Sequence, residues 1–464
     1  MPPFVSHATH PPGSWPKFVS HADAADAGAF KPTVVPGTDV PLLVFVNARS
    51  GGGKGQIVLN WFKAWLPESQ ICNLSLVGKG GPSPQAVLKR FVYVPKTRVL
   101  MCGGDGTCSW LLTAIDEVCK FAGVASGATL SAAVMPLGTG NDLSRALGFG
   151  HGFTGAMVKP AWALKVAQAA ETQLDRWSVT IAAASTPEGL PMGYVPLPSE
   201  DESLVRHRGL MYNYFSMGAE AAGLHGFHVA REANPAEFNS RLKNQVKMIQ
   251  YGAKNVGIGA PCCNKPYVPV SERTRLHVID RGATTWREVE LPPHLVSILV
   301  VNIRSHAAGR HVWEPVRKPW GAQSAGDGLV EIAAMQSLAH AGCYLMCGFG
   351  RFGACSGVKL AQAAALKFEL LEPVHVQIDG EPWLQPTGTI TIELAGKSAV
   401  LSPLKGRAAP PQSSTRVVPS GSSAATAPQA SRLPPEWKES YDPVAQHEYW
   451  ENSKTGETRW NRPC

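Results

Sequence analysis

The sequence predicts a doubly wound α/β domain on a parallel sheet, an antiparallel β-sandwich domain after it, and a small three-stranded module at the end. Three apolar runs in the first third of the chain each end in a glycine-rich turn and a helical stretch, as buried parallel strands do. Short alternating strands with Gly/Pro turns follow, which is typical of a sandwich. The closing residues regain aromatics after a stretch rich in Pro, Ser and Ala. We expect a disordered tail at 1–38, the α/β domain at 39–173, the sandwich at 174–404, a flexible linker at 405–432 and the module at 433–464.

The composition is that of a globular protein with anionic partners. The chain has 464 residues, of which 44% are hydrophobic, and a net charge of +8 that favours nucleotides or anionic lipid headgroups. We find no nucleic-acid-binding signature and expect no nucleic-acid partner. Ten scattered cysteines without paired CxxC units disfavour a zinc module and a secreted disulfide framework. No apolar run reaches membrane-spanning length and no signal-peptide pattern opens the sequence, so we expect a cytoplasmic protein with only peripheral membrane contact.

The first strand is expected at 41–47, where the sequence is almost continuously apolar. It runs into a turn that contains Ser50, Gly51, Gly52 and Gly53, and a helix is expected at 57–66. The turn is not a Walker A motif, because Gly-x4-Gly-Lys-Ser/Thr cannot be aligned with it. A weak strand at 74–77 and a helix at 84–92 should follow.

The second turn carries the most chemistry. A strand at 99–102 ends in Gly103-Gly104-Asp105-Gly106-Thr107, and an apolar helical pattern begins directly after it. The glycines allow close backbone approach, and the unpaired N–H groups at a helix start favour an anion such as phosphate. A single turn of this kind is equally consistent with a plain strand-to-helix connection.

The third turn decides between these readings. A strand at 132–135 leads to Gly138-Thr139-Gly140-Asn141-Asp142 and a short helix at 143–147. In an open parallel sheet all three turns lie at the carboxyl edge, where the ligand crevice forms. Three turns at one edge predict a nucleotide-phosphate site.

The second half is expected to be mainly strands after a helix at 161–172. Strands are predicted at 177–181, 276–279, 296–303, 329–333, 375–378 and 389–394. An exposed loop is expected at 190–202, and a basic helix at 227–251. The basic residues between Arg241 and Lys254 either rest on an anionic bilayer or form a solvated helix face.

Several short motifs are distributed along the chain between residues 45 and 383. They are Phe45-Val46-Asn47 with Ser50-Gly51-Gly52, Cys102-Gly103-Gly104-Asp105-Gly106-Thr107, Leu137-Gly138-Thr139-Gly140-Asn141-Asp142-Leu143, Leu174-Asp175-Arg176-Trp177, Asn213-Tyr214-Phe215-Ser216-Met217-Gly218, Phe238-Asn239-Ser240-Arg241-Leu242-Lys243-Asn244 and Val376-Gln377-Ile378-Asp379-Gly380-Glu381-Pro382-Trp383. Residues 42–404 thereby resemble the catalytic and accessory regions of eukaryotic diacylglycerol kinases. The Gly-Gly-Asp-Gly-Thr turn alone is shared with sphingosine and ceramide kinases, and more loosely with NAD kinases and phosphofructokinases. The stretch 238–244 is more particular to diacylglycerol kinases and favours that substrate class.

The resemblance implies transfer of the ATP γ-phosphoryl group to the free hydroxyl of diacylglycerol, giving phosphatidate in lipid signalling. It also implies a requirement for Mg²⁺ and an active site in the cleft between the two domains. Ala48 and Arg49 stand where the family usually has Pro and Lys, and Arg49 keeps the positive charge. The sequence shows neither a Cys/His-rich lipid-binding zinc domain nor an EF-hand, so recruitment to membranes is expected to depend on other features.

Backbone N–H groups of the glycine turns are expected to hold the ATP phosphates, with hydroxyls of the same turns as further donors. The expected ATP-binding residues are Asn47, Ser50, Gly51, Gly52, Gly53, Gly103, Gly104, Gly106, Thr107, Gly138, Thr139, Gly140, Asn141 and Asp142. Asn141 and Asp142 serve nucleotide recognition or cap the next helix. Asp105 orients Mg²⁺, activates the lipid hydroxyl or acts as a helix N-cap.

Asp379-Gly380-Glu381 is the second candidate for a catalytic acid group. The resemblance places a catalytic acidic residue here, with Glu381 the first choice and Asp379 its partner. A carboxylate within hydrogen-bond reach of the acceptor hydroxyl can take its proton. The competing interpretation is a hairpin turn between strands, where Asp-Gly is common.

Residues 433–464 resemble a WW domain, with Trp437, Trp450 and Pro463 as its small buckle. By that match Tyr449, Thr458 and Trp460 form a groove for a proline-rich segment. Alternatives are a sphingosine- or ceramide-type kinase and a catalytically silent scaffold for the WW module. A dinucleotide-binding protein is disfavoured, because no Gly-x-Gly-x-x-Gly follows the first strand.

Overall fold

The computed structural model describes residues 32–191, 193–234, 247, 268–316, 318–346, 356–403, 437–442, 447–452 and 458–459. The chain forms two compact units, Met1–Arg407 and Ala408–Cys464. The first unit contains the predicted turns and both halves of the expected site.

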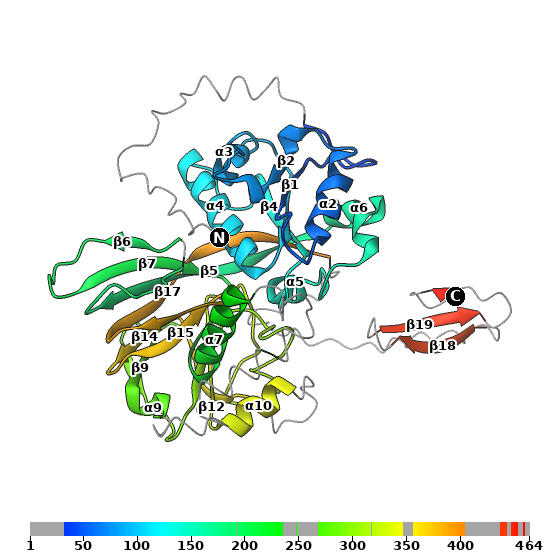
Figure 1. Ribbon diagram of the computed structural model, residues 1–464. Helices are drawn as coiled ribbons and strands as arrows, with labels where there is room; N and C mark the ends of the chain where they lie inside the picture. The colour runs from blue at the N-terminus through cyan, green and yellow to red at the C-terminus, as the bar shows by residue number, and fades with distance from the viewer. Residues whose placement is uncertain are drawn as a thin grey trace, which may run out of the picture. The chain divides into compact units, whose positions relative to one another are not determined.

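The α/β half of the first unit is a parallel sheet with helices on both faces. Its strands are β1 (Leu42–Val46), β2 (Ile71–Asn73), β3 (Thr97–Gly103) and β4 (Leu130–Pro136), in the spatial order β2-β1-β3-β4. Its helices are α2 (Lys54–Lys63), α3 (Pro84–Lys89), α4 (Asp105–Ala122), α5 (Asp142–Leu147) and α6 (Pro160–Ala167). Helices α3 and α4 cover one face, and α2 and α6 the other (Figure 1). The strand order reverses between β1 and β3, and a crevice forms at such a switch point.

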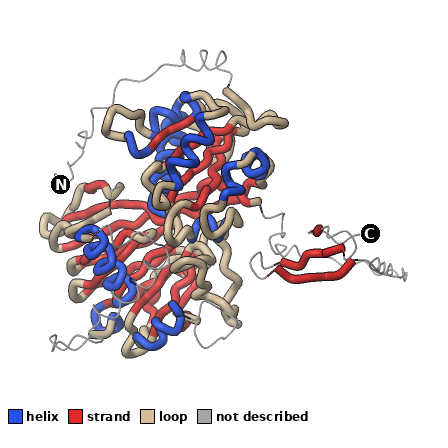
Figure 2. The backbone as a smooth tube through the Cα atoms, turned by 45° about the vertical axis from the view of Figure 1, so that its right-hand side comes forward, coloured by secondary structure: helices blue, strands red, loops and turns tan. Residues whose placement is uncertain are grey.

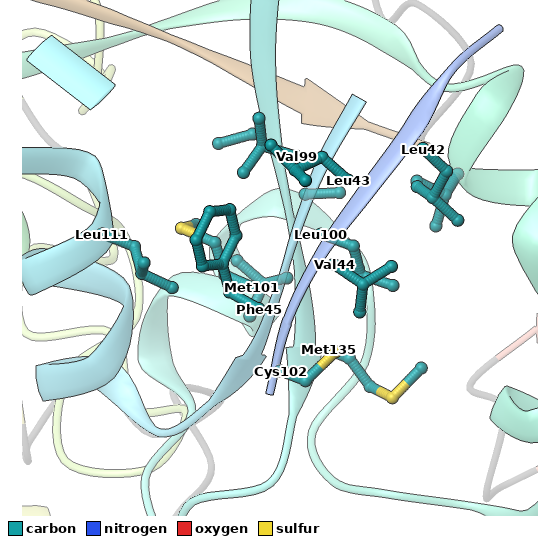
Figure 3. Packing of buried hydrophobic residues seen from close by; sticks show 14 of the residues in the cluster. Leu42, Leu43, Val44, Phe45, Val99, Leu100, Met101, Cys102, Leu111 and Met135 are labelled. Atoms are coloured by element: carbon teal, nitrogen blue, oxygen red, sulfur yellow. The ribbon is translucent and has the colours of Figure 1, made fainter. Parts of the chain in front are cut away.

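The parallel strands are buried on both faces, which explains their continuous apolar sequence. Every residue of β1 is buried. Phe45 and Met101 point toward Leu111 of α4, whereas Leu42 and Val44 point to the opposite face (Figure 3). This alternation is that of a pleated strand covered by helices on both sides.

Two element predictions in this half are wrong. Residues 74–77 were expected as a strand, but the strand is β2, and Leu74–Leu76 is a 3-10 turn. The Asn73 side chain accepts a hydrogen bond from the Ser75 N–H at 3.1 Å, which stabilises the turn against an extended backbone. The helix expected at 161–172 ends with α6, because the following residues already belong to a strand.

The second half consists of two antiparallel layers. Its strands are β5 (Ala170–Ala183), β6 (Val195–Leu197), β7 (Val205–Met211), β8 (Tyr214–Gly218), β9 (Thr274–Ile279), β10 (Arg287–Val289), β11 (Ser297–Val301), β12 (Val330–Met335), β13 (Val358–Ala363), β14 (Ala365–Leu370), β15 (Val374–Ile378), β16 (Glu381–Gln385) and β17 (Gly388–Ser402). One sheet has the order β13-β12-β11-β8-β15-β16. Apolar residues of both sheets form one core, which includes Trp177, Phe215 and Phe368. Strands predominate here, while helices flank the α/β half (Figure 2).

Three helices complete the described part of this half: α7 (Ala219–Ala233), α9 (Val270–Arg273) and α10 (Leu338–Met346). The expected loop at 190–202 contains the short strand β6. Apart from Lys247, the basic stretch 241–254 lies outside the described residues, as does the motif at 238–244. Within the described chain, no helix is long and apolar enough to cross a membrane.

The long strand β17 joins the two halves of the first unit. It pairs with β5 along its length, and its Val400 also pairs with Ala132 of the parallel strand β4. The boundary expected between residues 173 and 174 therefore falls inside β5. A continuous backbone ladder, rather than a linker, connects the nucleotide-type half to the sandwich half.

The second unit contains a three-stranded antiparallel sheet of β18 (Trp437–Asp442), β19 (His447–Asn452) and β20 (Thr458–Arg459). A small three-stranded module was expected in this part of the chain. Tyr449 lies on β19 and Thr458 on β20, while Trp460 lies outside the described residues.

Candidate active site

The three glycine-rich turns meet at the carboxyl edge of the parallel sheet, as predicted. A Cβ added at Gly138 would lie 2.5 Å from the Cα of Gly104, and one added at Gly51 would lie 2.9 Å from the Leu137 carbonyl oxygen. Neither distance is compatible with a side chain. The turns can approach this closely only because they consist of glycine.

The first turn is tied to the second by Asn47. Its backbone N–H donates to the Cys102 carbonyl at 3.0 Å, and its Nδ2 donates to Thr107 Oγ1 at 3.4 Å. Gly51, Gly52 and Gly53 follow with φ of 68°, 62° and 93°, a left-handed conformation that favours glycine. The Thr107 hydroxyl is thus held beside the first turn.

The third turn is held in shape by Asn141. This residue is buried, with a φ of 55°, and its Nδ2 donates to the carbonyl oxygens of Gly138 and His151 at 2.8 and 3.1 Å. Its Oδ1 accepts from the Gly138 N–H at 2.8 Å. The Asn141 side chain therefore stabilises the turn from within, and its predicted contact with the nucleotide stays a prediction.

Asp105 caps a helix other than its own. It is the first residue of α4, but its carboxylate accepts from the N–H groups of Asp142 and Leu143, at the start of α5, at 3.1 Å each. Burial raises the pKa of Asp105 to about 7, the nearby charge of Asp142 adds to the rise, and the two N–H bonds oppose it. Asp105 therefore does cap a helix N-terminus, but the helix is α5 and not α4, to which Asp105 belongs.

Asp142 fastens the sandwich half to the third turn. Its carboxylate accepts from Ser305 Oγ at 2.5 Å, from the N–H groups of Gly309 and Ala308 at 3.0 and 3.1 Å, and from the Tyr214 hydroxyl at 3.2 Å. Local sequence pattern did not identify the 305–309 loop as part of the site. Asp142 precedes Ser305 by more than 160 positions in the sequence, so no local pattern could connect them.

Asp379 is a buried anchor at the hairpin between β15 and β16. Its carboxylate accepts from Ser109 Oγ and Tyr212 N at 2.9 Å each, and from the N–H groups of Asn213 and Tyr214 at 2.8 and 3.1 Å. Burial raises its pKa, and the four hydrogen bonds oppose the rise. Both oxygens are engaged by the protein, which suits a residue that positions the turn rather than one that takes a proton.

Glu381 lies opposite the second turn with its carboxylate in the cleft. Its Oε1 would be only 3.2 Å from a Cβ added at Gly106, so that glycine leaves the space which the carboxylate fills. Among the described residues, no hydrogen bond reaches the Glu381 carboxylate. Burial raises its pKa, while the charge of Arg231 opposes the rise and those of Asp379 and Glu232 add to it. The chain thus brings one uncommitted carboxylate to the glycine-rich turn.

These residues line one large cleft of about 2730 Å³. The predicted residues along it are Asn47, Ser50, Gly104, Asp105, Gly106, Thr107, Gly138, Thr139, Gly140, Asp142, Asp379 and Glu381. Gly51, Gly52, Gly53, Gly103 and Asn141 belong to the same turns but do not line the cleft, and Gly52 and Gly53 are exposed. The facing wall includes parts of α7 and α10. The last turns of α7 overlap the helix expected at 227–251, whereas its earlier turns and α10 were not expected from the sequence.

The donor set fits a magnesium ion that also binds substrate phosphates. In the described part of the chain, no group of three or more His, Cys, Asp or Glu side chains is placed to hold a metal. Mg²⁺ usually takes one or two carboxylates together with phosphates and water. Asp105 supplies a half-buried carboxylate on the cleft beside Asp142.

Comparisons with known proteins agree with this geometry. Residues 41–175 match the family model "Diacylglycerol kinase catalytic domain", and residues 210–382 match "Diacylglycerol kinase accessory domain". The chain is 33% identical over 369 residues to diacylglycerol kinase theta of Homo sapiens, covering 78% of this chain and 35% of that protein. It is 32% identical over 368 residues to diacylglycerol kinase 1 of Arabidopsis thaliana, covering 78% of this chain and 44% of that protein.

The matched region thus spans about a third to under half the length of these curated relatives. A crystal structure of a diacylglycerol kinase from Bacillus anthracis str. Sterne covers 78% of this chain and 96% of its own, with 15% identity and a TM-score of 0.42. The chain carries the catalytic and accessory domains of diacylglycerol kinases and is homologous to the eukaryotic members of that family.

Proposed function

We propose that this chain is an ATP-dependent diacylglycerol kinase. The observation that carries the proposal is the position of Glu381, an uncommitted carboxylate directly against Gly106 of the glycine-rich turn. The family matches and the homologous kinases support the substrate class. The phosphate donor and the group that activates the acceptor then share one cleft.

The nucleotide is bound by the turns. Backbone N–H groups of the glycines and the hydroxyls of Ser50, Thr107 and Thr139 donate to the ATP phosphates, as phosphoryl transfer requires. When bound, Mg²⁺ would supply charge neutralisation at these phosphates, and Asp105 would hold it. The Asp105 carboxylate is fixed for this role by two N–H bonds from α5.

Glu381 acts as the general base. The diacylglycerol hydroxyl oxygen attacks the γ-phosphorus, the bond from that phosphorus to the β–γ bridging oxygen breaks, and ADP leaves. The hydroxyl proton passes to the Glu381 carboxylate, whose raised pKa makes it a stronger base than an ordinary glutamate. Asp379 fixes the hairpin from which Glu381 projects, through its four hydrogen bonds.

The test compares Glu381→Gln with Glu232→Gln. Glu232 is an exposed residue of α7 whose charge also acts on Glu381, so its variant removes a similar charge nearby and leaves the Glu381 carboxylate in place. Phosphatidate formation from ATP and diacylglycerol vesicles should fall about 10²- to 10⁴-fold in Glu381→Gln, and stay close to wild type in Glu232→Gln. Equal rates in the two variants would remove Glu381 from the reaction.

The same assay separates the alternatives. Phosphorylation of sphingosine or ceramide in place of diacylglycerol would indicate a sphingosine- or ceramide-type kinase. Absence of Mg²⁺-dependent turnover on all three lipids would indicate a silent scaffold.

We further propose that the second unit is a WW domain that binds proline-rich segments. Its three-stranded antiparallel sheet has the layout that such a domain requires. Tyr449, Thr458 and Trp460 form the peptide groove by the sequence match. Titration with a proline-rich peptide should change the tryptophan fluorescence of the wild type, and Trp460→Ala should abolish the change. A response that survives in Trp460→Ala would contradict this groove.

Peripheral contact with anionic membranes, through the basic stretch 241–254, completes the proposal. Co-sedimentation with vesicles should increase with their anionic lipid content. Co-sedimentation that does not depend on that content would contradict the membrane contact.

A further inference from the structure

The cleft wall that α7 contributes extends well beyond the phosphate-binding turns. Residues from Ala219 to Arg231 face the cleft along one side of this helix. The twelve steps of 1.5 Å from Ala219 to Arg231 give this wall a length of about 18 Å. The cleft therefore has room along α7 for an extended ligand in addition to a nucleotide.

One end of this wall is at the reacting site. Arg231 lies close enough to Glu381 for its charge to lower the pKa of that carboxyl group. The guanidinium of Arg231 also lies 5.6 Å from the ring centroid of Phe227, one turn earlier in α7. A ligand whose hydroxyl lies at Glu381 thus meets the apolar part of α7 next.

The middle of the wall is apolar. Leu224 and Phe227 are buried and form a small cluster, separate from the larger cores of the described residues. Leu299 of β11, Met335 of β12 and Leu338 of α10 line the same cleft. Between Glu220 and Arg231 the α7 residues that line the cleft are Gly223, Leu224, Phe227 and His228, and burial lowers the pKa of His228 to about 4, which leaves it uncharged at neutral pH. We call this part of the cleft the apolar branch.

Helix α10 leaves open space on this branch. Gly342 lies in the middle of α10 and lines the cleft, and a Cβ added there would meet nothing within 4 Å. Glycine inside a helix is unfavourable by about 0.5–1 kcal/mol relative to alanine. At this position it leaves free volume along the cleft.

The far end of the wall is polar. His306 is 1% exposed, lies 3.7 Å from Glu220 Oε1 through its Nε2, and has no hydrogen-bond partner at that nitrogen. Its Nδ1 lies 3.1 Å from the Tyr344 hydroxyl. Ser216 Oγ donates to Glu220 Oε2, so this end is a hydrogen-bonded polar cluster. Hydrocarbon placed against it would shut the Glu220 carboxylate and the unpartnered His306 Nε2 away from water, which is unfavourable. The apolar branch therefore has a defined length.

We propose that this branch, between α7 and α10, holds one acyl chain of the acceptor lipid, and that the polar end at Glu220 and His306 limits the chain length. The inference rests on the proposed diacylglycerol kinase activity. A single acyl chain spans about half of the roughly 30 Å hydrocarbon core of a bilayer, near 15 Å, which matches the length of the α7 wall. The chain passes Phe227 and Leu224 and continues toward Gly342.

The test fills the open space at Gly342. Gly342→Phe places a ring in the branch, while Gly342→Ala adds one methyl group and serves as the matched control. We expect Gly342→Phe to lower kcat/KM for dipalmitoylglycerol by about tenfold or more relative to dihexanoylglycerol, with the KM for ATP unchanged. Activity on the short-chain lipid shows that the variant is folded, and Gly342→Leu repeats the test should the larger residue not be tolerated.

Equal losses on the two lipids, or no loss on either, would overturn the inference while leaving the kinase activity intact. A wild-type protein that phosphorylates neither diacylglycerol would instead overturn the proposed function.

Discussion

Gly106→Ala should lower the rate of phosphatidate formation and raise the stability of the folded chain, so the two effects can be measured separately. The added Cβ would lie 3.2 Å from Glu381 Oε1, a few tenths of an ångström inside ordinary contact. The carboxylate is the mobile end of a side chain, so it moves rather than the helix. A displacement of 1 Å at a reacting group can cost about a hundredfold in rate, so a few tenths should cost roughly fivefold to tenfold.

The same substitution removes a glycine from the first turn of α4. Alanine there should stabilise the folded chain by about 0.5–1 kcal/mol. Initial rates of phosphatidate formation and urea denaturation of the same preparation measure the two effects. Gly342→Ala is the control, since it is also a helical glycine on the cleft but has open space around it. A Gly106→Ala enzyme with an undiminished rate would refute the close apposition of Glu381 to the turn.

Two further predictions concern the buried carboxylates. The pKa of Asp105 is raised from 3.8 to about 7 in the folded chain, so folding favours its protonated form, and its contribution to stability is present at low pH and lost as the pH rises to about 7. The urea midpoint should therefore fall between about pH 4 and pH 7, and Asp105→Asn should flatten that fall. An identical pH profile in the variant would contradict the assignment. Asp142→Ala removes the acceptor of four hydrogen bonds, whose donors are Ser305, Ala308, Gly309 and Tyr214. The substitution should lower the free energy of unfolding by on the order of 3 kcal/mol. An unchanged urea midpoint would show that Asp142 does not hold the loop in place.

The sequence was sufficient for the parts of the site that depend on local pattern. Apolar runs that end in glycine turns predicted the parallel strands, because buried parallel strands need continuous apolar residues. Positive φ and close backbone approach require glycine, so the turns could be recognised as well. Asp105 was a candidate from such a turn, whereas Glu381 was a candidate because the family resemblance places a catalytic acidic residue there.

What could not be predicted depends on contacts between distant residues. No local pattern shows that Asp142 binds the 305–309 loop, or that β17 returns to pair with β4. The position of α7 along the cleft could not be predicted either, because an amphipathic helix has the same period whether it faces a core or a cleft. Asp379 was expected as a partner in catalysis, and only its four donors indicate that it is an anchor.

The central claim is that the cleft transfers phosphate from ATP to diacylglycerol. Its most direct test is incubation of the full-length protein with radiolabelled ATP, Mg²⁺ and mixed vesicles that contain diacylglycerol, sphingosine and ceramide in equal amounts. We predict that the label enters phosphatidate alone, and that chelation of Mg²⁺ abolishes the incorporation. Label in sphingosine phosphate or ceramide phosphate, or none in any lipid, would contradict the account.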